Sequence, residues 1–552
     1  MHKYRWAWPL LISVPLLAWV IYPIALLLLE SVTLQILPFR ARAMGWNPDA
    51  QPLGAPLRRL LYEAASREAI SGTIKISILS ALTSCAWGLG LALLWWRREF
   101  PLRRFFAALG YAPLLMPPLV GTLAFFRLIG DGGLIWASGQ PPIKGFWLVL
   151  IMHTYSFGVF TYAYVAAALD GADQSREEAA RSLGAGPFRS FWTAVLPVIW
   201  LPLLASALLT LMASAASFSA PFILDNSSRY LTVEIVREAG DTGMQRALTA
   251  VLAILSLAVL PLFLIATGQG KVTPEAAFGA KGAARRMLRQ SSAGGMVARL
   301  CLSVVAMVLL LTPPLLVIIA AVFPSLINAP ELPAFGIFST LTSSDLASLA
   351  RSSAYAAIAA AIVIFFASVI TLTLRRATIW TALPIEIPVM LAIAIPGSAI
   401  AIALKSAVHA GSWLSFGVPL GNTAAILIIA YAIRDLPLAV RPARAAIAAV
   451  GTDVEHAASS LGATPLTVKL RILLPLIFPS LLAAFLVCFI NGAGEFVASV
   501  LLFSPSTMPV SVRINELYRL DPAPAYALSL CLMLMSAVAI AAAAWLQRRL
   551  AR

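Results

Sequence analysis

Long apolar stretches run through the whole of this chain and leave little choice of fold. A helix needs about 20 apolar residues to cross the hydrocarbon core of a bilayer, and we count about twelve stretches of that length. Of the 552 residues, 60% are hydrophobic and 12% are charged, whereas soluble domains carry roughly 25% charged residues. The stretches lie near residues 7–30, 72–96, 105–129, 146–169, 199–224, 247–268, 300–324, 352–374, 379–404, 422–447, 477–503 and 526–547. The pattern predicts an all-α polytopic membrane protein with about 12 transmembrane helices.

Basic residues collect on one side of the predicted membrane. They follow the second and eighth stretches, fill the segment 271–298 and end the chain. Because an even number of spans separates these segments from the N-terminus, the positive-inside rule predicts that they and both termini are cytoplasmic. The rule also explains most of the net charge of +16, so no nucleic-acid partner is expected. The arginine-containing segment 31–70 departs from the rule and is predicted to lie outside.

The first apolar stretch follows the basic residues His2, Lys3 and Arg5, as the apolar part of a signal peptide would. Its apolar run is longer than that of a typical signal peptide, and no clear small-residue cleavage site follows it. We therefore expect a retained transmembrane helix.

The chain repeats itself at a fixed offset. Pro118 recurs 278 residues later as Pro396, and Gly184 recurs at the same offset as Gly462. Further matches at this offset are Arg97-Arg98 with Arg375-Arg376 and Ser217 with Glu495, and residues 231–235 match 510–514 with a slip of one residue. Each half carries six spans, so the halves are predicted to be parallel repeats about an axis along the membrane normal. The predicted parts are a first repeat over 1–270, a basic cytoplasmic linker over 271–298 and a second repeat over 299–552.

A short polar loop occurs twice, each time between the fourth and fifth spans of its half. In the first copy, Glu177 and Glu178 stand where the N-terminus of a helix favours negative charge. Ala179 and Ala180 are strong helix formers with small side chains. Gly184 supplies the positive φ that ends a short helix. The pattern predicts a helix–turn–helix with a small-residue surface on the cytoplasmic face.

Prolines follow the turn. Pro187 fits the first position of a second short helix, and Pro197 is expected to break that helix before the next span begins. The second copy has the same layout over 455–475. Two equivalent loops favour a docking surface for a soluble partner over ordinary interfacial loops with helix-capping residues. The predicted docking residues are Glu177, Glu178, Ala179, Ala180, Gly184 and Pro197 in the first copy and Glu455, His456, Ala457, Ala458, Gly462 and Pro475 in the second.

The two loops and the paired six-span halves resemble those of ABC importer permeases, the inner-membrane components of binding-protein-dependent transport systems. The resemblance covers essentially the whole chain. It implies that each loop is a coupling helix, that two copies of a cytoplasmic ABC ATPase subunit dock on the loops, and that an extracytoplasmic solute-binding protein delivers the solute. It also implies a bacterial inner membrane, with the lipid bilayer around the spans.

The chain departs from the family's loop at one position, where the first copy has Glu178 and the second has His456. A histidine there would make the second docking contact sensitive to pH, unless Glu455 or the backbone suffices for docking. No G-x-x-x-x-G-K-[ST] phosphate-binding loop occurs. ATP and Mg²⁺ are therefore expected on separate subunits, with no catalytic residue and no cofactor in this chain.

A charged residue inside an apolar span is a candidate for a transport pathway, because placing it there costs at least about 2.5 kcal/mol. Glu495 lies in such a span, and Ser217 is its counterpart. Its rival role is a buried carboxylate paired with an arginine or a hydroxyl. Pro118 and Pro396 are expected to break or kink matching helices, a pattern that marks translocation paths but also serves packing. The predicted pathway residues are Glu495, Ser217, Ser219, Pro118 and Pro396.

Other polar residues in the spans are predicted to serve packing. The predicted interhelical hydrogen-bonding residues are His153, Tyr155, Tyr162 and Tyr164. Glu386, Arg434 and Asp435 are weaker pathway candidates, and the alternative for Arg434 and Asp435 is that they neutralise each other. The four cysteines lie in apolar stretches without metal-ligand spacing, so no metal site is expected and packing is their predicted role.

The fused two-repeat length resembles the ferric-iron group of importers, with thiamine and aminophosphonate permeases as close relatives. The segments that carry this likeness are 217–221, 394–397 and 494–496. Ferric iron is therefore the expected solute, with thiamine, aminophosphonate or another small solute as the alternative. A secondary transporter driven by an ion gradient is an alternative, but it would not need two docking loops. A membrane-embedded enzyme is disfavoured, because no paired His, Asp or Glu motif has catalytic spacing.

Overall fold

A computed structural model gives the fold of this chain. Its described residues are 7–32, 60–96, 99–131, 133–136, 143–170, 175–268, 293–327, 340–375, 377–408, 412–415, 417–418 and 420–550. Every element in these ranges is a helix or a helical turn.

Nine helices of the described part are long and apolar enough to cross a bilayer. They are Leu11–Ser31, Ala64–Trp96, Phe146–Asp170, Phe188–Ala215, Thr242–Thr267, Ala293–Val322, Ser343–Leu374, Pro465–Ala493 and Pro522–Leu546. Trp380–Ala394 and Gly397–Ala407 form a further candidate that is bent by 119° at its centre. The prediction of an all-α polytopic fold is confirmed.

Two predicted spans differ from this pattern. The stretch 105–129 is divided into α6 (Arg103–Leu109), a 3₁₀ turn (Ala112–Leu115) and α7 (Pro118–Ile129). Pro113 and Pro117 lack the backbone N–H that a continuous helix requires at those positions. The stretch 422–447 is one helix, α21 (Ala424–Ala448), but its charged residues reduce its apolar character. These charged residues are Arg434, Asp435, Arg441 and Arg444.

The chain divides into two compact units that differ from the predicted sequence repeats. Unit 1 comprises Met1–Ile70, Arg229–Leu257 and Ala320–Arg552, and unit 2 comprises Ser71–Ser228 and Ala258–Ile319. Unit 1 therefore combines most of the second predicted repeat with two segments of the first. Most of the predicted linker 271–298 lies outside the described residues.

The helices of unit 1 are α1 (Ala7–Leu16), α2 (Tyr22–Val32), α13 (Leu231–Arg237), α17 (Pro324–Ile327), α18 (Ser343–Leu374), α19 (Ile379–Ala394), α20 (Gly397–Ala407), α21, α22 (Thr452–Ser460), α23 (Pro465–Thr467), α24 (Leu474–Ala493), α25 (Val497–Leu502), α26 (Val510–Leu520) and α27 (Pro522–Leu550). Those of unit 2 are α6, α7, α8 (Phe146–Asp170), α9 (Ser175–Ser182), α10 (Pro187–Ser190), α11 (Leu196–Ala215) and α12 (Ser219–Leu224). Three helices contribute to both units, namely α5 (Ala64–Trp96), α14 (Thr242–Gly268) and α16 (Ala293–Val322).

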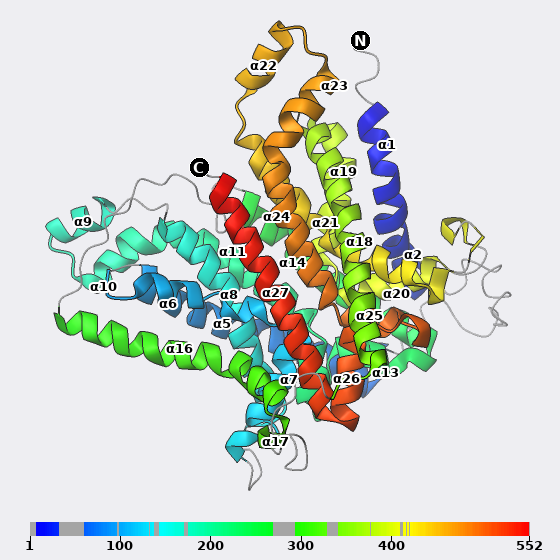
Figure 1. The fold of residues 1–552 in the computed structure, drawn as a ribbon, viewed down its shortest axis with the longest axis horizontal. Helices are drawn as coiled ribbons and strands as arrows, with labels where there is room; N and C mark the ends of the chain where they lie inside the picture. The colour runs from blue at the N-terminus through cyan, green and yellow to red at the C-terminus, as the bar shows by residue number, and fades with distance from the viewer. Residues whose placement is uncertain are drawn as a thin grey trace. The chain divides into compact units, whose positions relative to one another are not determined.

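Small residues allow three helices of unit 1 to pack closely. Ala360 and Ala367 on α18, Ala439 and Ala443 on α21, and Cys488 on α24 are all fully buried in one apolar cluster. Small side chains let helix backbones approach each other within a membrane. Helices α18, α21 and α24 thus form the core of this unit, with α27 packed beside α24 (Figure 1).

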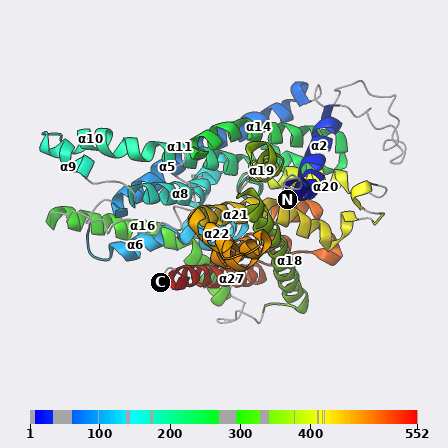
Figure 2. The ribbon, with the colours of Figure 1, turned by 90° about the horizontal axis from the view of Figure 1, so that it is seen from above.

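Glycines allow a similar approach in unit 2. A Cβ atom at Gly88 on α5 would lie 2.3 Å from the carbonyl oxygen of Gly158 on α8, so only glycine fits there. Helix α8 also packs against α11, where Tyr164 contacts Ala205. In both views of this unit, α9 and α10 extend beyond the start of α11 (Figures 1 and 2).

Candidate functional site

The first predicted docking loop forms the expected helix–turn–helix. Helix α9 ends at a turn in which Gly184 has a φ of +84°. The N–H of Gly184 donates to the carbonyl of Arg181 at 2.9 Å, and the N–H of Ala185 donates to that of Ala180 at 3.0 Å. This pair of bonds is the Schellman motif, which satisfies the last carbonyls of a helix. Helix α10 then begins at Pro187.

The second loop reproduces this turn. Gly462 follows α22 with a φ of +85°. Its N–H donates to the carbonyl of Ser459 at 3.0 Å, and the N–H of Ala463 donates to that of Ala458 at 3.0 Å. The prediction that both glycines adopt a positive φ is confirmed.

The prediction that Pro197 breaks the helix is wrong. The segment Phe188–Ala215 is helical throughout and includes a π-helical turn, Phe191–Val195, just before Pro197. The second loop has a π-helical turn, Val468–Leu473, in the same place before Pro475. The wider π-helical turn accommodates the proline ring and its missing N–H, so the helix continues.

Large apolar side chains are exposed on both loops at matching positions. Leu183 and Leu461, each next to the turn glycine, are 88% and 90% exposed. Four further side chains are each more than half exposed, namely Phe188 and Trp192 on the first loop and Leu466 and Leu470 on the second. The prediction of a small-residue surface missed this apolar surface. Its signal was the i, i+4 spacing of apolar residues, which recurs in both copies.

The predicted docking glutamates have different environments. Glu177 forms an ion pair with Arg181 of the same helix at 3.0 Å, and Glu178 is exposed. Glu455 is buried and forms an ion pair with Arg375.

The two loops also differ in the exposure of their other predicted docking residues. His456, Ala179 and Ala457 are exposed, Ala180 is half-buried and Ala458 is buried. The second loop therefore presents an imidazole where the first presents a carboxylate.

In unit 1, an ion pair joins the two helix breaks that contain predicted pathway residues. Arg434 on α21 pairs with Glu495, which lies between α24 and α25. A carboxylate oxygen of Glu495 also accepts a hydrogen bond from the N–H of Ala498 at 3.0 Å. The guanidinium of Arg434 lies against Gly397, where a Cβ would be 2.7 Å from Nη1. Gly397 follows Pro396 at the break between α19 and α20, so Arg434 connects this break to Glu495.

The prediction that Arg434 and Asp435 neutralise each other is wrong. Arg434 pairs with Glu495, and Asp435 accepts a hydrogen bond from the side chain of Asn491 on α24. Neighbouring residues on a helix point about 100° apart, so the two side chains reach different helices. Glu386 on α19 pairs with Arg444 on α21 at 2.6 Å.

In unit 2, uncharged groups connect the corresponding positions. His153 on α8 is fully buried, and its Nε2 lies 3.0 Å from the hydroxyl of Ser217. Its Nδ1 lies 3.0 Å from the hydroxyl of Ser80 and 3.1 Å from that of Ser214. These contacts join α8 to α5 and to the end of α11.

The Pro118 break in unit 2 has a similar uncharged contact. The hydroxyl of Thr122 donates to the carbonyl of Pro118 at 2.8 Å and to the hydroxyl of Ser219 at 3.4 Å. The structure therefore brings Pro118 and Ser219 together, while Ser217 lies beside His153.

The predicted hydrogen-bonding role of two tyrosines on α8 is confirmed. Tyr155 donates to the carbonyl of Leu310 at 2.9 Å, and Tyr162 donates to that of Ala107 at 2.6 Å. Tyr164 packs in an apolar cluster with Ala205.

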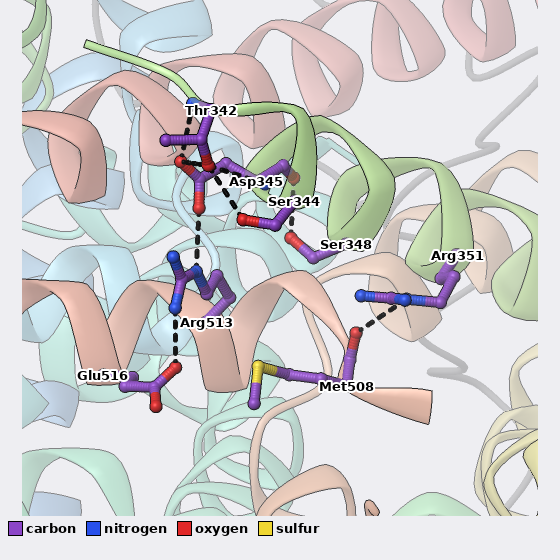
Figure 3. A network of polar contacts seen from close by, with 8 residues as sticks. All are labelled: Thr342, Ser344, Asp345, Ser348, Arg351, Met508, Arg513 and Glu516. Atoms are coloured by element: carbon purple, nitrogen blue, oxygen red, sulfur yellow. Dashed lines mark hydrogen bonds and ion pairs between the residues drawn. The ribbon is translucent and has the colours of Figure 1, made fainter. Parts of the chain in front are cut away.

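A further polar network joins the start of α18 to α26 in unit 1 (Figure 3). Asp345 is buried and caps α18 by accepting a hydrogen bond from the N–H of Thr342 at 2.8 Å. Arg513 on α26 donates to Asp345 at 2.7 Å and to Glu516 at 2.9 Å. The hydrogen bond to Asp345 raises the pKa of the Arg513 guanidinium above its usual value. Nearby, Arg351 donates to the carbonyl of Met508 at 3.2 Å.

The match of Arg513 in the first repeat carries the opposite charge. With the one-residue slip, Arg513 corresponds to Glu234 on α13, which also lies in unit 1. Glu234 is buried and forms ion pairs with Arg229 at 3.2 Å and Arg237 at 2.7 Å.

Among the described residues, no cluster of three or more His, Cys, Asp or Glu side chains could hold a metal ion.

Comparison with known proteins places these features in one family. The family model described as "Binding-protein-dependent transport system inner membrane component" matches residues 84–272 and 372–552. The Fe(3+)-transport system permease protein FbpB 2 of Haemophilus influenzae is 26% identical over 460 residues, which cover 83% of this chain and 85% of that protein. The probable ABC transporter permease protein y4fN of Sinorhizobium fredii is 26% identical and covers 81% of each chain. The probable molybdenum ABC transporter permease protein HVO_B0370 of Haloferax volcanii is 30% identical, over 43% of this chain and 87% of its own length. The two family matches together span more than half of the chain, which therefore belongs to the binding-protein-dependent transport system inner membrane components, the permeases of ABC importers.

Proposed function

We propose that this chain forms the membrane path of an ATP-driven importer and that its two loops bind two copies of a cytoplasmic ABC ATPase subunit. The exposed apolar side chains of both loops carry this proposal. Leu183 and Leu461 occupy equivalent positions and are almost fully exposed beside identical turns. Burying one leucine side chain contributes about 1.5–3 kcal/mol to binding. Because the two loops are equivalent, each can bind one copy of the same subunit.

We further propose ferric iron as the solute, delivered by an extracytoplasmic binding protein. Relatives named as ferric permeases align with 81–83% of this chain, so their likeness extends over both repeats. The relative named for molybdenum aligns with 43% of the chain. The coverage of both repeats favours iron over molybdenum. In this proposal, ATP and Mg²⁺ bind the partner subunits, and both termini face the cytoplasm of a bacterial inner membrane.

Transport in proteoliposomes tests the proposed function. The chain is reconstituted with its ATPase subunit and its binding protein, and uptake of radioactive ferric iron is measured. We expect uptake that requires ATP and that an ionophore leaves intact. Uptake without ATP that collapses with an ionophore would instead identify a secondary transporter.

The docking surface is tested by replacing Leu183 and Leu461 with aspartate. Each change removes an apolar contact of about 1.5–3 kcal/mol, so the affinity for the ATPase subunit should fall at least about tenfold per loop. Affinity is measured by titrating labelled ATPase subunit onto the permease in nanodiscs. Leu520→Asp on α26 is the matched control, since that leucine is also highly exposed but lies outside both loops. Equal binding by the double variant and the control would refute the docking surface.

A further inference from the structure

We infer that Arg375 is a positioning residue that ties the second coupling helix, α22, to the ends of α18 and α21. A displacement of α22 would then move both long helices together. This inference rests on the proposed function, because it concerns how an ATPase docked on the second loop acts on the membrane helices.

The guanidinium of Arg375 is where three elements of unit 1 meet. Arg375 directly follows α18. It donates hydrogen bonds to the carbonyls of Ile447 and Val450, the latter at 2.9 Å, at the end of α21. It also forms an ion pair with Glu455 in the first turn of α22. One side chain thus connects the end of α18, the end of α21 and the start of α22.

The electrostatics of α21 and α22 favour this arrangement. The C-terminal end of α21 carries unsatisfied carbonyls and partial negative charge, which attract a cation. The N-terminal end of α22 carries partial positive charge, which favours a carboxylate. Arg375 and Glu455 are both largely buried, and a buried ion pair resists separation because each charge alone would be uncompensated.

Helix α22 has little other attachment through its own side chains. Only Glu455 and Ala458 are buried among its nine residues. The remaining side chains are exposed, including those of His456 and Ala457. Among the described residues, the ion pair is therefore the main polar link between α22 and the long helices.

The internal repeat supports a role within the chain. Arg375 and Glu455 correspond to Arg97 and Glu177 at the offset of 278, so the residue types of the pair occur in both copies. Arg97 lies outside the described residues. The next position differs between the copies, with Glu178 in one and His456 in the other. These two residue types thus recur where the neighbouring exposed residue does not.

The test uses the complete transporter in proteoliposomes and compares Arg375→Gln with the wild type. We expect the variant to bind the ATPase subunit and hydrolyse ATP, while the amount of solute moved per ATP falls about tenfold, a typical size for coupling between sites. The matched control is Arg444→Gln, because Arg444 on α21 also forms an ion pair with a carboxylate of another helix, that of Glu386 on α19. The control should retain the wild-type ratio of transport to hydrolysis.

A charge reversal keeps the test decisive if Arg375→Gln does not fold. Arg375→Glu combined with Glu455→Arg restores the ion pair but places a carboxylate at the carbonyls of α21. We expect this double variant to transport better per ATP than either single reversal. The link from α22 to α18 and α21 through Arg375, here called the tether, is refuted if the double variant transports no better per ATP than the single reversals. It is also refuted if Arg375→Gln matches the wild type, or if this variant loses transport and ATP hydrolysis in equal proportion.

Hydrogen exchange in the full chain without partners separates this inference from the proposed function. Amide exchange in α22 should accelerate in Arg375→Gln and stay unchanged in Arg444→Gln. If α22 responds in this way but the wild-type complex shows no ATP-dependent transport, the proposed function fails and the tether stands. If the wild type transports but α22 exchanges equally in all three proteins, the tether fails.

Discussion

The two repeats hold their helix breaks with different chemistry. In the second repeat, the ion pair between Arg434 and Glu495 joins α21 to the break after α24. At the same offset in the first repeat stand Ser156 and Ser217, and the hydroxyl of Ser217 lies instead beside the buried imidazole of His153. The same backbone break is thus stabilised by opposite charges in one copy and by uncharged hydrogen bonds in the other. The two repeats therefore share the position of the helix break but differ in the side chains that stabilise it.

The largest effect is expected from Arg434→Ala. Removing this side chain leaves the carboxylate of Glu495 buried without its cation, which costs about 3–5 kcal/mol of folding free energy. The counterpart Ser156→Ala should cost about 1 kcal/mol or less, because its hydroxyl contacts only the sulfur of Met152 among the described residues, at 3.8 Å. Unfolding by denaturant in detergent micelles measures both changes.

A neutral pair provides the control for this prediction. Arg434→Met combined with Glu495→Gln removes both charges, and replacing a whole buried ion pair is often close to neutral for stability. The double variant should recover most of the loss. A double variant as unstable as Arg434→Ala would show that the arginine acts through packing, and the contrast in chemistry between the repeats would lose its energetic meaning.

The partner of Arg434 shows where the sequence stops being informative. The apolar stretches and the fixed offset predicted the spans, the repeated loops and the breaks at Pro118 and Pro396, because these depend on local composition. The ion pair joins residues 61 positions apart, and no local pattern connects them. Asp435, one residue away, was the obvious partner in the sequence, but helix geometry turns it towards Asn491.

In the docking loops, too, local features were predictable from the sequence and contacts between distant residues were not. Their turns were predictable because Gly184 and Gly462 are fixed by backbone conformation. Burial of Glu455 was not predictable, because it depends on Arg375, 80 residues earlier. Exposure of Leu183 was not predictable either, because in a mostly apolar sequence an exposed leucine cannot be distinguished from a buried one.

The next effect in size is expected at His153. His153→Phe should destabilise the chain by about 1–3 kcal/mol, because the buried hydroxyls of Ser80 and Ser214 would lose their partner. The counterpart Tyr431→Phe should cost about 0.5–1.5 kcal/mol, because Ser499 keeps its hydrogen bond to the carbonyl of Glu495. The same denaturant measurement ranks the two variants.

The ranking of these two variants sharpens the contrast between the repeats. Tyr431 and His153 occupy matching positions, so their difference measures how much each break relies on a central hydrogen-bonding side chain. Ser84→Ala on α5 is a suitable control, because in the part of the chain that the structure describes that hydroxyl contacts only the backbone carbonyl of His153, at 3.3 Å. If Tyr431→Phe lowered the free energy of unfolding more than His153→Phe, the His153 imidazole would not be the main hydrogen-bonding group at the break after α11.

A smaller effect than that of Arg434→Ala is expected at the turn glycines, where the two repeats should behave alike. An alanine in the left-handed conformation costs about 1–2 kcal/mol, and both Gly184 and Gly462 have that conformation with open space around the position of a Cβ. Gly184→Ala and Gly462→Ala should therefore each speed amide exchange in the preceding helix by about five- to thirtyfold, the ratio that corresponds to this energy. Exchange in α9 and α22, followed by mass spectrometry, gives the two values.

Two neighbouring glycines distinguish strain from bulk. Gly186 and Gly451 also have open space at the position of a Cβ, but neither has a positive φ. Gly186→Ala and Gly451→Ala should leave exchange in α9 and α22 nearly unchanged, because the added methyl group meets neither strain nor a neighbour. If Gly462→Ala accelerated amide exchange much less than Gly184→Ala, the contacts of Arg375 would be stabilising α22 despite the strained turn. The two loops would then differ in mechanics as well as in the charge that they expose.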